Sequence, residues 1–165
     1  MLFLSFNCRG LSILSKNIVL HRLVEEKHPN VLFLHKSMCD GQVIVAELEL
    51  LIKGWKFVCV DVKDKYGGLL LGLKVICFHF LNSWVVVSGL GVSIYSIELK
   101  FPFWFINIYD PYLEREGLLN NILSKYCIDK SNIILGGDLN FSLGFSKIWG
   151  SQDRVDNNFD FFTPN

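Results

Sequence analysis

The chain has 165 residues, of which 51% are apolar and 19% charged, and its mean hydropathy is +0.36. Such a composition excludes intrinsic disorder, and the length predicts a single folded domain over residues 1–165. Sixteen Lys and Arg residues balance sixteen Asp and Glu residues. This balance excludes nucleic-acid binding by bulk positive charge, so any such binding has to come from a localised site.

The first part of the chain alternates strands with helices. Residues 2–6 predict a short strand, and Ser15 is expected to cap a helix that ends before Pro29. The continuous apolar run 31–34 predicts a second strand, and residues 42–51 predict a second helix. Strands that are apolar throughout indicate a buried sheet with helices packed against it.

The second part of the chain is richer in strands. We expect strands at 55–62, 69–73, 75–81, 84–87, 92–99 and 103–109, then a helix over 114–127 and a strand over 132–135. The chain thus combines strands that are separated by helices with consecutive strands that form hairpins. A pure doubly wound fold does not have this order, whereas a two-sheet α/β sandwich does.

The sequence carries no pattern that directs it out of the cell or into a membrane. Its start has a short apolar run without a basic segment before it, so no signal peptide is expected. The apolar stretch 68–92 contains Lys74 and clusters of β-branched residues, which favour buried strands over a membrane helix. The five cysteines form no CxxC pair, which argues against a zinc site. Most of them lie in apolar runs and are expected to be buried thiols, which suits a reducing compartment, the nucleus or cytoplasm.

Polar residues interrupt the chain where predicted strands end. They are Asn7, the triplet 35–37, the segment 107–110 and the segment 138–140. Functional sites of α/β sheets collect at the carboxyl ends of strands, so these four spots are expected to converge. The alternative is that these strands simply end in polar loops.

The segment Gly136-Gly137-Asp138-Leu139-Asn140 is the most specific of these spots. Two glycines allow a tight turn or a close approach of the backbone. Asp138 is placed to orient or deprotonate a water molecule, and Asn140 points the same way in an extended chain. A purely structural alternative is that Asp138 caps a turn.

Five segments in this order resemble one family: LSFNCRGL at 4–11, PNVLFL at 29–34, GGL at 67–69, NIYDPY at 107–112 and GGDLNF at 136–141. They are similar to the endonuclease/exonuclease/phosphatase superfamily, specifically to the endonuclease domain of plant LINE-type retrotransposons. The resemblance implies a two-sheet α/β sandwich, Mg²⁺-dependent hydrolysis of phosphodiesters, and DNA as the partner.

The resemblance also implies roles for individual residues. Asn7 matches an Asn near the metal, and Tyr109 matches the Tyr that contacts the scissile phosphate. Asp138 matches the Asp that positions or activates the attacking water, and Asn140 matches the Asn that binds the phosphate. We place Asn107 with Tyr109 and Asn140 among the substrate-binding residues.

The sequence departs from the family at the expected metal ligand. Lys36 stands where the family has the Glu that is its principal metal ligand, and an ammonium group does not ligate Mg²⁺. Lys36 is expected instead to pair with Asp138, whereas His35 or Asp40 could supply a substitute ligand. Asp110 also stands where the family usually has a small residue.

The family's terminal Asp-His pair has no counterpart in this sequence, so the domain is expected to be incomplete at the C-terminus. We therefore predict a retrotransposon-derived, endonuclease-like domain whose catalysis is impaired. One alternative is an active Mg²⁺-dependent DNA endonuclease with substitute ligands. Another is a non-catalytic binding module. No membrane association and no obligate protein partner are expected.

Overall fold

The chain forms two helices and eight strands in a computed structural model that describes residues 1–61, 67–86, 88–109, 120, 122, 124 and 132–138. In chain order these are β1 (Phe3–Asn7), α1 (Leu14–Lys27), β2 (Val31–His35), α2 (Gly41–Leu51), β3 (Trp55–Val60), β4 (Leu69–Lys74), β5 (Phe78–Val86), β6 (Gly89–Ser96), β7 (Pro102–Tyr109) and β8 (Ile133–Asp138). The expected alternation of strands and helices, followed by a run of strands, is confirmed.

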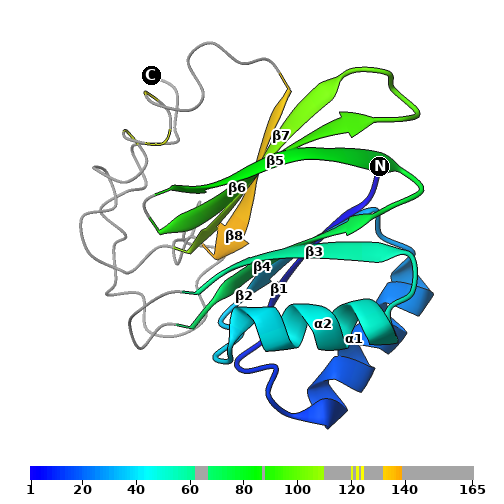
Figure 1. Cartoon of the computed structure of the whole chain (residues 1–165), viewed down its shortest axis with the longest axis vertical. Coiled ribbons are helices and arrows are strands. Elements are labelled where there is room, and N and C mark those ends of the chain that lie inside the picture. Colours follow the sequence, from blue (N-terminus) through cyan, green and yellow to red (C-terminus); the bar gives the residue numbers. More distant parts are fainter. Residues whose placement is uncertain are drawn as a thin grey trace, which may run out of the picture.

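The strands form two four-stranded sheets, which lie face to face (Figure 1). The first sheet has the order β1-β2-β4-β3, and its β1 and β2 are parallel. The second sheet has the order β5-β6-β7-β8, and its β7 and β8 are parallel. The predicted two-sheet α/β sandwich is therefore confirmed.

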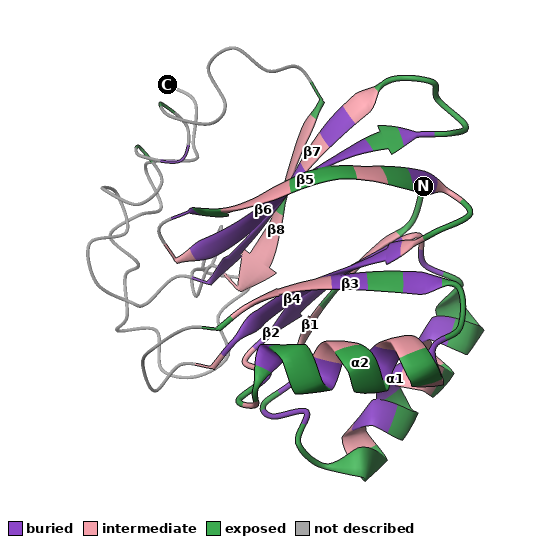
Figure 2. Cartoon of the chain, viewed as in Figure 1, coloured by how far each residue is buried: buried purple, intermediate pink, exposed green. Residues whose placement is uncertain are grey.

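Helices α1 and α2 cover the outer face of the first sheet, so this sheet is buried on both sides (Figure 1). Along β2, Leu32 and Leu34 pack with residues of both helices, whereas Val31 and Phe33 pack toward the second sheet. Side chains alternate between the two faces of a strand, so a strand covered on both faces is apolar throughout. Figure 2 accordingly shows β2 and β4 as largely buried strands.

Aromatic rings fill much of the layer between the two sheets. The rings of Phe33 in β2 and Phe105 in β7 meet edge to face, with 6.1 Å between their centroids. A Cβ atom on Gly136 of β8 would lie 2.6 Å from the ring of Phe33, and one on Gly137 would lie 2.0 Å from the carbonyl oxygen of Ile108. The two glycines before Asp138 therefore let β8 pack closely against its neighbours.

Some local predictions are wrong. The strand expected at 92–99 is β6, which begins at Gly89 and ends at Ser96, and a turn follows at 97–99. Helix α1 begins one residue before Ser15, and its cap position is Ile13, which makes no side-chain capping bond. The strands expected at 75–81 and 84–87 are one strand, β5, with a bulge between Phe80 and Asn82. The first of them begins later than expected because a turn precedes it, closed by a hydrogen bond from the Cys77 amide to the Lys74 carbonyl.

Several expectations concern residues outside the described part of the chain. These are Val62 at the end of the strand expected at 55–62, most of the helix expected over 114–127, and the residues Asp110 and Asn140. Among the residues that are described, no helix is both long enough and apolar enough to cross a membrane.

Candidate functional site

Four strands end at the same place, with a polar residue as the last residue of each. Asn7 and His35 are the last residues of the parallel strands β1 and β2, and they face each other in the register. Tyr109 and Asp138 hold the same positions in β7 and β8 of the other sheet. We call these four residues and Lys36 the strand-end cluster. The expected convergence of polar residues at strand ends is therefore observed for these positions.

A hydrogen bond joins the two sheets at this cluster. The Asn7 side-chain nitrogen donates to the Asp138 carboxylate over 2.8 Å, across 131 residues of sequence. The other side-chain atom of Asn7, Oδ1, is buried and accepts no hydrogen bond from any residue in the described part of the chain. Asn7 therefore holds the carboxylate of Asp138 in place, as an orienting residue would.

His35 of the cluster forms a buried bridge with Asn107 of β7. His35 is 1% exposed and Asn107 is 0% exposed, and 2.7 Å separates His35 Nε2 from Asn107 Oδ1. The side-chain nitrogen of Asn107 donates to the carbonyl oxygens of Leu34 and Leu70, over 3.1 and 2.8 Å. Since that nitrogen is the donor end of the amide, Oδ1 is an acceptor, which assigns a proton to His35 Nε2.

This bridge shows a structural role for Asn107. Its side-chain nitrogen and oxygen both bond to groups of the protein interior, whereas its expected contact with a substrate stays a prediction. We therefore assign it to positioning β7 against the first sheet. His35 is likewise engaged in this bridge, and Asp40 caps α2 by accepting hydrogen bonds from the Gln42 and Val43 amides. The role of either residue as a substitute metal ligand stays a prediction.

Burial lowers the pKa of His35 below its ordinary value of 6.5, and this effect outweighs the hydrogen bond to Asn107 and the nearby charge of Asp138. Between the lowered pKa and 6.5 the unfolded chain binds more protons than the folded one, so stability falls as pH falls. We expect the free energy of unfolding to decrease between pH 7.5 and pH 5.5.

This pH dependence is measured by urea unfolding at the two pH values. The His35→Gln variant keeps a donor for Asn107 but does not titrate, so its stability should change less over the same interval. His79→Gln, at an exposed position, is the control and should follow the natural chain. Equal pH dependence in all three proteins would contradict the assignment of a neutral, buried His35.

The backbone around Lys36 is tightly held, although its conformation is unusual for a lysine. Lys36 has a φ of 56°, in the left-handed region that costs a non-glycine residue about 1–2 kcal/mol. Its carbonyl accepts a hydrogen bond from the Gly10 amide, and the Ser37 amide donates to the Gly68 carbonyl. A Cβ atom on Gly67 would lie 3.1 Å from the Lys36 Cα, so this glycine allows the close approach.

The side chain of Lys36 lies within the cluster. Its ammonium nitrogen is 4.9 Å from the centre of the Tyr109 ring, and Tyr109 is the register partner of Asp138. The charges of Lys36 and Asp138 both act on the pKa of His35, in opposite directions. A cation above the face of an aromatic ring is stabilised by about 0.5–2 kcal/mol. The expected ion pair of Lys36 with Asp138 stays a prediction.

The described part of the cluster does not fit a magnesium ion. Asp138 and Asn7 Oδ1 are suitable oxygen donors, but Lys36 brings a positive charge to the same cluster, which disfavours a divalent cation. No group of three His, Cys, Asp or Glu residues within the described ranges could hold a metal ion. Asn140, the remaining predicted site residue, lies outside the described residues.

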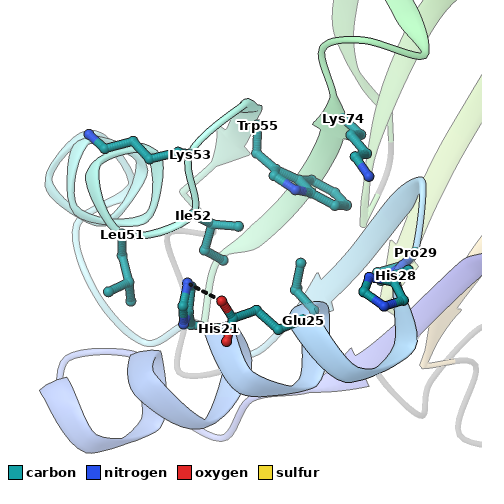
Figure 3. A pocket seen from close by; sticks show the side chains of 10 residues that line it. His21, Glu25, His28, Pro29, Leu51, Ile52, Lys53, Trp55 and Lys74 are labelled. Atoms are coloured by element: carbon teal, nitrogen blue, oxygen red, sulfur yellow. Dashed lines mark ion pairs between the residues drawn. The ribbon is translucent and has the colours of Figure 1, made fainter.

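A hollow of about 520 Å³ lies at the opposite end of β2, between the ends of α1 and α2 (Figure 3). Pro29, Trp55 and Lys74 contribute to its walls, and His21 approaches Glu25 there, with 3.6 Å between Nε2 and Oε1. None of the residues predicted from the sequence as site residues lines it. The hollow is therefore separate from the strand-end cluster.

No family model matches the sequence, and no curated protein does. Solved structures of similar fold include an endonuclease/exonuclease/phosphatase family protein from Bacteroides thetaiotaomicron, with a TM-score of 0.62 and 14% identity over 82% of this chain. A mannosyl-6-phosphatase from the same species has a TM-score of 0.70 and 14% identity over 98%. D. rerio TDP2, complexed with a single-strand DNA product, has a TM-score of 0.67 and 17% identity over 84%.

These likenesses show the fold: the chain has the α/β sandwich of endonuclease/exonuclease/phosphatase proteins. The chain spans 60% of the length of the first and third of these proteins and 70% of the second.

Proposed function

We propose that this chain is a retrotransposon-derived, endonuclease-like domain that binds the phosphodiester backbone of DNA but hydrolyses it poorly. The observation that carries the proposal is the meeting of Asn7, Tyr109 and Asp138 at the ends of three strands from two sheets. In this proposal Tyr109 and Asn140 contact the phosphate. Asp138, oriented by Asn7, positions the attacking water.

The weak catalysis follows from charge. A carboxylate at position 36 would add a negative charge beside Asp138 and favour a divalent cation, which polarises the ester bond and stabilises the leaving oxygen. Lys36 adds a positive charge at this point instead. Since the described cluster then offers a divalent cation no net negative charge, that contribution to catalysis is weakened.

Nicking of supercoiled plasmid in the presence of Mg²⁺ tests this function. We expect the natural chain to retard the plasmid in a native gel, yet to nick it no faster than the Asp138→Ala variant. Nicking by the natural chain that Asp138→Ala removes would instead support an active endonuclease. Absence of retardation would contradict binding of the phosphodiester backbone.

A further inference from the structure

Lys36 gives the strand-end cluster an ammonium group, which is the kind of group that binds an anion. We propose that Lys36 takes the place of a divalent cation, so that the cluster binds the phosphate group of a phosphodiester directly through the lysine ammonium, without metal. This inference rests on the proposed function, because it specifies how the same site holds its ligand.

The first support is the position of the ammonium group. The backbone of Lys36 is held by hydrogen bonds on both sides, and the ammonium stacks on Tyr109, which is only 4% exposed. A flexible surface lysine would lose side-chain entropy on binding a ligand. Lys36 loses less side-chain entropy on binding, because the contact with the Tyr109 ring already restricts its side chain in the free protein.

The second support is that lysine at position 36 keeps the cluster from carrying a net negative charge. Lys36 contributes one positive charge and Asp138 one negative charge, while His35 is buried and its pKa is lowered, which favours the neutral ring. A phosphodiester carries a negative charge, and an ammonium group offers it three hydrogen-bond donors. With a glutamate at position 36 the same cluster would carry two negative charges and would repel the ligand unless a cation were added.

The experiment measures the affinity for a short fluorescein-labelled DNA duplex by anisotropy, once in EDTA and once in excess Mg²⁺. We expect the natural chain to bind with the same affinity in both buffers. Lys36→Met should weaken binding at least about tenfold in both, the loss of one charge-assisted hydrogen bond. Lys36→Arg should preserve most of the affinity, and Lys36→Glu should bind only when Mg²⁺ is present.

Lys53→Met is the matched control, because Lys53 is an exposed lysine that lines the hollow at the opposite end of β2. It should bind like the natural chain, and thermal unfolding confirms that each variant is folded. Binding that requires Mg²⁺, or that survives Lys36→Met, would overturn the role of Lys36 while leaving the proposed function standing. Absence of DNA binding in both buffers would overturn the proposed function itself.

Discussion

The Asn107→Leu variant is expected to lose about 3 kcal/mol of unfolding free energy, because three hydrogen bonds of about 1 kcal/mol each disappear from a dry interior. These bonds connect β7 of the second sheet to His35, Leu34 and Leu70 of the first. Leucine matches asparagine closely in size, so the loss reports on polar groups left unpaired. Urea unfolding followed by tryptophan fluorescence measures it as a lower midpoint at an unchanged slope.

Asn82→Leu is the control, because Asn82 is an exposed residue of β5 and its replacement should leave the midpoint almost unchanged. A double-mutant cycle with His35→Phe sharpens the test. If the two side chains bond to each other, the double variant loses less unfolding free energy than the two single variants together. In the double variant His35 is replaced as well, so no buried ring nitrogen is left without an acceptor. Strictly additive losses would contradict the bridge.

The fold could be predicted from the sequence because its elements have strong local patterns. The apolar run of β2 reflects burial on both faces of one sheet, as Leu32 and Phe33 illustrate by packing to opposite sides. The division of β5 into two expected strands was wrong because its bulge and its polar residues resemble a turn. A bulge depends on the partner strand, which a local pattern does not contain.

The candidate site could be predicted only in part, for a related reason. Polar residues after apolar strands indicated Asn7, Tyr109 and Asp138 individually, and the convergence of strand ends predicted their proximity. The buried bridge between His35 and Asn107 spans 72 residues, and nothing local distinguishes a polar residue that faces a ligand from one that satisfies another buried group. The sequence does not predict the stacking of Lys36 on Tyr109 for the same reason, since no local pattern identifies this contact.

The Asp138→Asn variant is expected to bind DNA about tenfold more tightly than the natural chain in EDTA. Two like charges about 5 Å apart repel by about 3 kcal/mol at an effective dielectric constant of about 20. Solvent screening at the half-buried Asp138 reduces this to about 1.4 kcal/mol, which is tenfold in affinity. The asparagine keeps an oxygen that can accept the hydrogen bond from Asn7, so the link between the sheets is preserved.

The direction of this change separates two ways of holding the phosphate. If Lys36 binds it, removing the negative charge of Asp138 strengthens binding, because a like charge no longer repels the phosphate. If a divalent cation binds it, removing a carboxylate that holds the cation weakens binding in Mg²⁺. Glu26→Gln removes one negative charge from an exposed position on α1 and controls for the change in net charge. Weaker binding by Asp138→Asn in EDTA, with Glu26→Gln unchanged, would contradict direct binding by Lys36.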